Sequence, residues 1–472
     1  MEISNLDMAK LLAEKVNTKS GRAYFVGGYV RDKFLQDNKY DSNADIDIEV
    51  HCIEESDLVD ILESIGPYSK IGRFFPVYKF LGYNIDIALP RSEKKTGDKH
   101  QDFSVNIDPY MGTYKACERR DFTINAIMED ILTGEFIDPF NGISDIKNKI
   151  IRHVNTDKFG EDPLRVLRAA MFAARFSFDI DIETINLSKE IDLSNLSKER
   201  VFVELEKALL MSKRPSIFFE RLGEMNHVNY WFPEIEKLKG VEQSEEHHLE
   251  GDVYRHTMMV LDEAANLKEK SELPLSFLLA CLCHDFGKIV ATETINRKVH
   301  AYKHEIKGLP LVKDFVKRLT KNKKILKYVL NMTELHMKPN IMAKDKSKIK
   351  STNKMFYESI SPNDLILLAI ADNKASLSIY EKEDPSNFLY ERYEIFKTYM
   401  EKDYVKGKDL INLGIKEGQV FNELLSLSLK HRLAGIEKKE SLKQILGYYK
   451  SISKKYEEKN LWNGRVGENP TT

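Results

Sequence analysis

Two aspartates one residue apart constrain this chain more than any other feature. Asp45 and Asp47 stand in the run ADIDIEV at residues 44–50, in which apolar and acidic residues alternate. An alternation of period two predicts a strand with both carboxylates on one face. Because adjacent carboxylates repel one another unless a cation lies between them, the run predicts a divalent-metal site. An acidic, solvated strand edge is the simpler alternative. Asp86, in the run IDIA at 85–88, is either a third carboxylate of this site or a surface acid.

A glycine pair precedes the aspartates by about seventeen residues. The run FVGGYVRD at 25–32 predicts a strand that breaks at Gly27 and Gly28 and continues as a helix. Such a turn lets backbone N–H groups approach an anion closely, and Arg31 adds a positive charge. A phosphate site beside a pair of metal-binding aspartates is the equipment for phosphoryl or nucleotidyl transfer.

The length of 472 residues predicts several domains, because a single hydrophobic core rarely grows so large. Strand-like segments concentrate before residue 150, at 23–26, 46–50, 75–81, 84–89 and 135–137. Helical periodicity follows, then a zone that holds most of the histidines. We expect an α/β domain at 1–150, a helical region at 151–240, a histidine-rich domain at 245–380 and a charged helical body at 381–472.

The composition excludes several classes of protein. A net charge of only −2 means that any nucleic-acid site must be a local patch. The acidic N-terminal segment is neither a signal peptide nor a membrane span, so we expect no membrane partner. The four cysteines lack the spacing of a disulfide framework or a zinc finger, which favours a reducing, cytoplasmic location.

Three further motifs follow in order: RRDFTINA at 119–126, DPFNG at 138–142 and EDPLRVLR at 161–168. With the glycine turn and the aspartate pair, this series resembles the class II tRNA nucleotidyltransferases and the related bacterial poly(A) polymerases. The resemblance covers roughly residues 20–210. It implies an α/β nucleotidyltransferase head, built from a small mixed sheet with helices, followed by an all-α neck.

The resemblance also implies roles for single residues. Asp45 and Asp47 would be catalytic and would hold Mg²⁺, which neutralises the triphosphate and lowers the pKa of the attacking RNA 3′-hydroxyl. A surface ion pair is the alternative interpretation of the arginine-rich run at 119–121. The implied nucleotide-binding set in the head consists of Gly27, Gly28, Arg31, Arg120, Asp121 and Asn125.

The run EDPLRVLR predicts the start of a helix. An aspartate before a proline is typical of a helix cap, and capping alone would explain Asp162. Asp162, Arg165 and Arg168 also follow at steps of three residues and therefore share one helix face. An Asp/Arg pair can imitate a Watson–Crick edge and select CTP and ATP. This resembles the protein template of the family, in which no nucleic acid dictates the base.

The segment at 91–98, RSEKKTGD, predicts a mobile polar loop. In CCA-adding members of the family a flexible element in this interval helps the switch from C to A addition. Its presence argues against an enzyme that adds CC only.

A second constellation lies in the histidine-rich zone. His256, the doublet His284-Asp285 and Asp372 stand on or beside apolar helical runs, where ionisable groups are costly to bury unless a cation collects them. The pattern resembles the HD metal-dependent phosphohydrolases and implies a site for a second divalent metal (Ni, Mn, Co or Fe). Whether the domain hydrolyses phosphate esters or only stiffens the protein stays open. In some members the positions of His300, His304 and His336 bind a second metal or phosphate, and Lys288 could meet a phosphate.

We therefore expect a nucleotidyltransferase that adds or repairs the 3′-terminal CCA of tRNA from CTP and ATP, without a template and with Mg²⁺. Alternatives are a poly(A) polymerase, a specialist that adds only A or only CC, and an HD phosphohydrolase acting on RNA ends. The chain would be a monomer or a homodimer. Near its end, the run GKDLINLG at 407–414 looks like a segment of HD-bearing CCA-adding enzymes, and Arg432 could help to hold the tRNA elbow.

Overall fold

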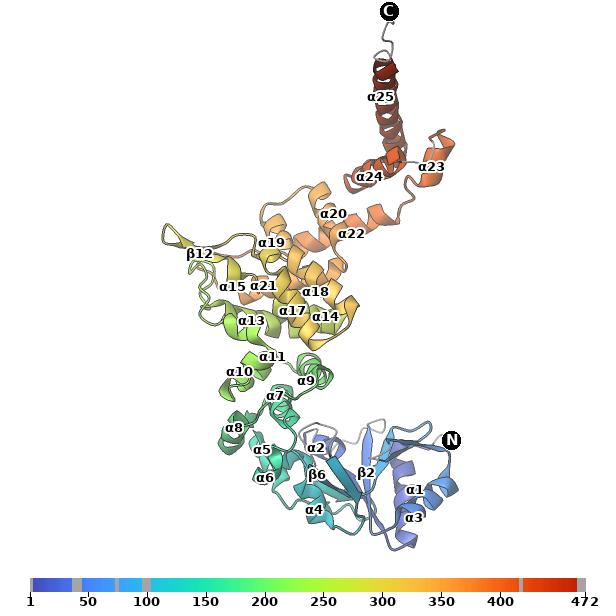
Figure 1. Ribbon diagram of the computed structural model, residues 1–472, viewed down its shortest axis with the longest axis vertical. Coiled ribbons are helices and arrows are strands. Elements are labelled where there is room, and N and C mark those ends of the chain that lie inside the picture. Colours follow the sequence, from blue (N-terminus) through green and yellow to red (C-terminus); the bar gives the residue numbers. More distant parts are fainter. Residues whose placement is uncertain (1–2, 36–44, 73–75, 96–102, 416–418, 465–472) are drawn as a thin grey trace, which may run out of the picture. The chain divides into compact units, whose positions relative to one another are not determined.

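A computed structural model describes residues 3–35, 45–72, 76–95, 103–415 and 419–464 (Figure 1). The chain forms two compact units. The first comprises Met1–Glu236 with Lys317–Lys321, and the second comprises Lys237–Val316 with Asn322–Thr472.

A seven-stranded mixed sheet organises the first part of the first unit. Its strand order is β3-β4-β5-β2-β1-β8-β9, and β2 runs parallel to β5 while the other neighbours are antiparallel. The strands are β1 (Arg22–Val26), β2 (Ile46–His51), β3 (Tyr68–Ile71), β4 (Val77–Phe80), β5 (Ile85–Ala88), β8 (Met128–Asp130) and β9 (Phe136–Ile137). The α/β head predicted from the sequence is thereby confirmed.

Helices surround this sheet because each has one apolar face. In α1 (Asn5–Thr18) the side chains of Leu12 and Val16 are fully buried, and the helix packs on β1 and on α3 (Glu55–Ile65). The remaining helices of the head are α2 (Gly28–Leu35), α4 (Thr113–Glu118), the 3₁₀ turn η1 (Thr123–Asn125) and α5 (Gly142–Asn148).

The prediction of a loop over 91–98 is wrong for its first five residues. Arg91–Lys95 forms β6, which pairs antiparallel with β7 (Phe103–Ile107) in a two-stranded sheet. Backbone pairing does not require apolar side chains, so the polar run gave no sign of this strand. The rest of the predicted loop, residues 96–98, lies outside the described part of the chain.

The helical part of the first unit begins after a small parallel pair, β10 (Ile150–Ile151) with β11 (Asp179–Ile180). Its core contains the rings of Phe218, Phe219 and Phe232, which pack edge to face. Its helices are α6 (Thr156–Phe159), α7 (Leu164–Phe176), α8 (Ile182–Lys189), α9 (Lys198–Met211), α10 (Ser216–Glu224), α11 (Val228–Trp231) and α12 (Pro233–Lys237).

The second unit is helical apart from one hairpin, β12 (Thr292–Ile295) with β13 (Lys298–Ala301), within its described residues. Its centre is built by the packing of α13 (Val253–Ala265), α14 (Pro274–Cys283), α18 (Lys323–Leu335) and α21 (Pro362–Ala375). The other helices are η2 (Lys268–Lys270), α15 (Lys288–Ala291), α16 (His304–Lys307), α17 (Leu309–Leu319), α19 (Met337–Lys344), α20 (Ile349–Glu358), α22 (Ser386–Glu401), α23 (Gly407–Asn412), α24 (Gln419–Leu433) and α25 (Lys438–Gly464).

The run Pro274–Ala291 is the one described segment that is long and apolar enough to cross a membrane. Of this run, 72% is buried inside the fold, and the core helix of a globular domain passes the same test of length and composition.

The C-terminal body has a core of its own, to which Leu410, Leu424 and Ile445 contribute fully buried side chains. Arg432 donates hydrogen bonds to the carbonyls of Tyr399, Met400 and Lys402, at the end of α22. This arginine therefore caps a helix, which favours a structural role over the expected contact with tRNA.

Candidate active sites

The glycine turn of the head lies directly against the aspartate pair. β1 ends at Val26 and α2 begins at Gly28, so Gly27 forms the bend, with φ +66°. A Cβ atom at Gly27 would lie 3.4 Å from Asp47 Oδ2 and 3.5 Å from Arg120 Nη1. Glycine is therefore required here for its left-handed backbone, and the turn lies next to a carboxylate and a guanidinium.

The carboxylates occupy one face of the sheet, as the alternation predicts. Ile46 and Ile48 of β2 are buried, whereas Asp45 and Asp47 are exposed. Asp86 of the parallel strand β5 is the register partner of Asp47, which brings a third carboxylate to this face of the sheet. Partial desolvation by the surrounding protein raises the pKa of Asp47. Arg120 opposes this shift, whereas the carboxylates of Asp86 and Asp45 reinforce it. Carboxylates placed on one face of two paired strands are the kind of ligand that a hard divalent cation prefers.

A buried glutamate that sequence reasoning missed anchors the two arginines. Glu49 is 2% exposed and forms ion pairs with Arg119 and, at 3.4 Å, with Arg120. Burial would raise the pKa of Glu49, but the hydrogen bond with His51 and the two guanidinium groups hold it well below its usual range. The alternation places Glu49 on the face of Asp45 and Asp47, which was the available signal.

Four of the predicted nucleotide-binding residues form one hydrogen-bonded chain. Arg31 Nη1 donates to Asn125 Oδ1 at 2.8 Å, and Asn125 Nδ2 donates to Asp121 Oδ1 at 3.0 Å. Arg168 Nε donates to the other oxygen of Asp121 at 2.7 Å. Because Arg31 and Asn125 are 4% and 6% exposed, this chain favours a positioning role over a direct contact between Asn125 and a ribose.

The remaining two predicted residues, Asp162 and Arg165, lie at the start of α7. Asp162 Oδ1 accepts from the backbone N–H of Leu164 at 3.1 Å, so the capping interpretation holds. Asp162 Oδ2 accepts from Arg200 of α9 at 2.8 Å, a partner that no spacing in the sequence indicated. Arg165 donates to the carbonyls of Lys158, at 2.8 Å, and Arg119, at 3.0 Å. The helix start is thus tied to the arginine-rich run of the head.

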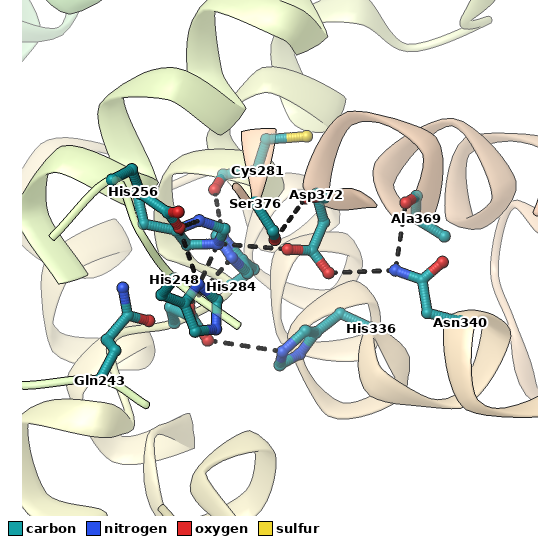
Figure 2. A network of polar contacts seen from close by, with 12 residues as sticks. Gln243, His248, His256, Cys281, His284, His336, Asn340, Ala369, Asp372 and Ser376 are labelled. Atoms are coloured by element: carbon teal, nitrogen blue, oxygen red, sulfur yellow. Dashed lines mark hydrogen bonds and ion pairs between the residues drawn. The ribbon is translucent and has the colours of Figure 1, made fainter. Parts of the chain in front are cut away.

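In the second unit, the predicted histidines and aspartates meet in two adjoining clusters. The first contains His256 of α13, His284 after α14 and Asp372 of α21, whose ligand atoms lie within 4.8 Å of one another. Figure 2 shows these side chains around one centre, with Asn340 donating to the outer oxygen of Asp372 at 3.1 Å.

Asp285 joins the first cluster to the second, which contains His304 and His336. Asp285 Oδ2 lies 3.3 Å from His284 Nε2 and 3.7 Å from His256 Nε2. Asp285 Oδ1 lies 3.1 Å from His304 Nε2 and 3.6 Å from His336 Nε2. One carboxylate therefore faces both groups of imidazoles.

His300, the third auxiliary histidine named from the sequence, belongs to neither cluster among the described residues. It lies in β13 and its ring stacks on Tyr302, with 5.0 Å between the ring centroids.

The side chains fit divalent cations, because the ring nitrogens at the centre lack protons to share. Nδ1 of His304 and Nδ1 of His336 each face a backbone carbonyl, which can only accept, so these nitrogens carry the protons. The two Nε2 atoms, 3.2 Å apart, are then two lone pairs facing each other. Within the described residues, Nε2 of His256 and of His284 are buried without a hydrogen bond of acceptable geometry. A cation between such nitrogens relieves both conflicts.

The pKa values of the two aspartates in the clusters favour metal binding. Burial alone would raise the pKa of Asp285, but Lys288 and His284 hold it well below its usual range. Burial likewise opposes the ionised form of Asp372, but the imidazole of His256, whose Nε2 lies 3.2 Å from Asp372 Oδ1, lowers its pKa. Both carboxyl groups are therefore ionised at neutral pH, as metal ligands must be.

A cavity of about 300 Å³ opens onto both clusters. It is lined by the ligands His284, Asp285, His304, His336 and Asp372, and by Lys288. Lys288 Nζ lies 2.7 Å from Asp285 Oδ2 and donates to Gln243 Oε1 at 2.7 Å. A fixed ammonium group beside the metal ligands suits a substrate that carries a phosphate.

The sequence matches three family descriptions in chain order. Residues 23–152 match the Poly A polymerase head domain, residues 177–239 match the probable RNA and SrmB-binding site of polymerase A, and residues 253–377 match the HD domain. Both the nucleotidyltransferase and the HD families use divalent metals.

Curated relatives match more than three quarters of the chain. The chain is 33% identical over 381 residues to the multifunctional CCA protein of Actinobacillus pleuropneumoniae serotype 5b, covering 78% of this chain and 89% of the relative. It is 35% identical over 390 residues to the multifunctional CCA protein of Mannheimia succiniciproducens, covering 79% and 89%.

Solved structures share the fold. A CCA-adding enzyme in apo form II has a TM-score of 0.66 at 22% identity, covering 94% of this chain and 95% of its own. The Bacillus stearothermophilus CCA-adding enzyme in complex with CTP has a TM-score of 0.65 at 20% identity, covering 95% and 98%. The Thermotoga maritima CCA-adding enzyme complexed with tRNA has a TM-score of 0.63 at 21% identity, covering 94% and 95%.

Proposed function

This chain belongs to the family of multifunctional CCA proteins, and from that premise we propose that it adds or repairs the 3′-terminal CCA of tRNA with CTP and ATP, without a nucleic-acid template. The observation that carries the proposal is the juxtaposition of Asp47, Asp86 and Arg120 at the Gly27 turn. These residues offer oxygen ligands for a cation and positive groups for phosphates in one place. The relatives named CCA proteins supply the reaction.

In this proposal Asp45 and Asp47, with Asp86 beside them, hold Mg²⁺. When bound, the ion supplies charge neutralisation at the triphosphate and acidifies the attacking 3′-hydroxyl. The backbone of Gly27 and Gly28 approaches the phosphates, and Arg120 stands next to the same turn. These fixed donors stabilise the charge that develops on the departing pyrophosphate.

Asp162 and Arg165 select the base at the start of α7. The carboxylate accepts from the exocyclic amino group that cytosine and adenine share, and the guanidinium donates to a ring acceptor. Arg200 holds Asp162 at 2.8 Å and so restricts its orientation before the nucleotide arrives. Arg168 fixes Asp121 one helical turn further along.

A second function is favoured by the paired clusters of the HD domain. We propose that they bind divalent transition-metal ions, from the group Ni, Mn, Co and Fe, and hydrolyse a phosphomonoester or a 2′,3′-cyclic phosphate of a nucleotide or RNA end. A bound ion supplies an activated water. Lys288 would hold the substrate phosphate in the adjoining cavity.

The partners follow from the reaction. We propose tRNA, CTP and ATP as substrates, a cytoplasmic location, no membrane partner, and a chain that acts as a monomer or a homodimer.

A tRNA that ends at the discriminator base tests the first function. Purified protein with Mg²⁺ receives each labelled nucleotide singly, then CTP and ATP together, and products are resolved to one nucleotide. Growth by two residues with CTP and a stop at three with both nucleotides supports CCA addition. A long ladder with ATP alone indicates a poly(A) polymerase, and growth by only A or only CC indicates a specialist.

The second function requires its own assay. Release of phosphate, or opening of a cyclic phosphate, should depend on Co²⁺, Ni²⁺, Mn²⁺ or Fe²⁺ and should be lost in His284→Ala. Hydrolysis that survives this substitution would arise elsewhere and would contradict the proposal.

A further inference from the structure

All four imidazoles of the HD clusters direct Nε2 toward the centre, but the partner that holds Nδ1 differs for one of them. Nδ1 of His284, His304 and His336 donates to a backbone carbonyl three residues earlier, at 2.7, 2.9 and 2.7 Å. Nδ1 of His256 instead donates to a carboxylate, Glu250 Oε1, at 2.9 Å. The ligand that lies closest to Asp372 is therefore the one held by a full negative charge.

Glu250 does not line the cavity, but it connects two of the elements that carry the candidate ligands. Its side chain is 1% exposed. Oε1 also accepts from His248 Nδ1 at 2.7 Å, and Oε2 accepts from the backbone N–H of Leu377 at 2.8 Å. Leu377 follows the end of α21, the helix that carries Asp372. One carboxylate thus links the ligand of α13 to the end of the helix that supplies the neighbouring ligand.

We propose that Glu250 is the positioning residue of the HD metal centre. Its carboxylate holds the Nδ1 proton of His256, which leaves the Nε2 lone pair directed at the metal, and its negative charge makes that lone pair a stronger donor. This inference rests on the proposed metal centre and goes beyond it, because Glu250 belongs to neither cluster around Asp285. Glu250 forms a third close group with His248 and His256, in which both imidazoles turn Nδ1 toward its carboxylate.

His248 provides a matched control. It donates to the same oxygen of Glu250, and the centroid of its ring lies 4.9 Å from that of His256. Figure 2 shows both rings. If Glu250 acts on the metal through His256, loss of His248 leaves that path intact. If the three side chains only fill space, loss of either partner should have the same effect.

The experiment is a Co²⁺ titration of the full-length, metal-free protein, followed by visible absorption. Signal from the HD centre is the part that His284→Ala abolishes. Glu250→Gln preserves the size of the side chain and removes its charge, and it should weaken Co²⁺ binding roughly tenfold to a hundredfold. His248→Ala should bind Co²⁺ like the parent. The melting temperature in EDTA reports separately on the metal-free fold.

Two outcomes overturn the inference while leaving the metal centre in place. They are parent-like Co²⁺ binding by Glu250→Gln, and equal weakening by Glu250→Gln and His248→Ala. Should Glu250→Gln fail to fold, Glu250→Asp, which keeps the charge, must bind Co²⁺ more tightly than Glu250→Ala. Equal binding by these two variants also overturns it. If the parent shows no Co²⁺ signal that His284→Ala removes, the proposed metal centre itself fails, and the inference fails with it.

Discussion

Asp45 and Asp47 stand on the exposed face of a strand, whereas His256, His284 and Asp285 are 1%, 1% and 2% exposed. The first site offers only carboxylate oxygens; of its positive neighbours, Lys79 pairs with Asp86 at 3.3 Å, and Arg120 is tied to a buried glutamate. The second site mixes imidazole nitrogens with carboxylates, and backbone carbonyls or Glu250 fix each ring.

This difference indicates two ways of using a metal. An open, all-oxygen site suits Mg²⁺, which keeps several waters and binds together with a nucleotide's phosphates. A closed site of nitrogen and oxygen ligands suits transition metals, and its ligands are already oriented before the ion binds. The two centres of one chain should therefore respond independently to substitution, to the choice of metal and to pH.

The largest effect should come from removing a head carboxylate. Asp47→Ala should reduce nucleotide incorporation by roughly a hundredfold to a thousandfold or more, because it removes a cation ligand and the neighbour of Asp86. Extension of tRNA and Co²⁺ binding are measured on the same preparation. The HD centre should bind Co²⁺ as before; a parallel loss of both properties would show that the sites are not independent.

The converse substitution removes the carboxylate that both HD clusters face. Asp285→Ala should weaken Co²⁺ binding by about a hundredfold or more. Loss of a group that only holds a metal ligand costs about tenfold to a hundredfold, and Asp285 itself lies beside all four imidazoles. Incorporation of CMP and AMP should continue at the parental rate. Retention of tight Co²⁺ binding would contradict the assignment of Asp285 as the shared ligand.

Local patterns in the sequence predicted the residues of both sites. Alternation placed Asp45 and Asp47 on one face of β2, and the glycine pair predicted the turn at Gly27. The HD ligands were identified because ionisable groups on apolar helices need a cation. The first two signals lie within a few residues of chain, where spacing alone determines geometry, whereas the HD residues come from separate apolar runs and were grouped by the cost of burying charge.

The sequence could not decide which long-range contacts form; it left Asp86 as either a third carboxylate of the head site or a surface acid. Asp86 meets Asp47 only because β5 pairs with β2 in a particular parallel register, and Arg200 meets Asp162 only because α9 packs on α7. Glu250 is separated from Leu377 by 127 positions. Tertiary packing decides such contacts, and one sequence carries no pattern that encodes them.

Substitutions at the start of α7 should change base selectivity in the head. Arg165→Ala should reduce discrimination against UTP and GTP by about 1–3 kcal/mol, because it removes one half of the Asp/Arg pair. Arg200→Ala should have a smaller effect in the same direction, since Asp162 keeps its hydrogen bond from Leu164. Single-nucleotide incorporation with each of the four triphosphates measures both. Unchanged selectivity in Arg165→Ala would exclude this arginine as a base reader.

The smallest expected difference between the two centres is in how their metal binding depends on pH. Burial opposes protonation of His256 and His304, but the neighbouring carboxylates, Asp372 and Glu250 for the former and Asp285 for the latter, stabilise the imidazolium and raise the pKa of both. A protonated imidazole cannot bind a metal, so a metal ion must displace its proton. Because the pKa of both imidazoles is raised, protons compete with the metal ion at a pH closer to neutral.

Co²⁺ affinity should therefore fall as the pH drops below the raised pKa values, by about tenfold per pH unit for each proton displaced. The Mg²⁺ requirement for incorporation should change less between pH 8 and pH 6, because the ordinary pKa of an aspartate carboxyl is about 4, well below that of an imidazole, although the raised pKa of Asp47 moves its titration toward this range. Titrations of both activities across this range test the contrast directly. A Co²⁺ affinity independent of pH would mean that the imidazoles are already neutral, and that their carboxylate partners act on orientation alone.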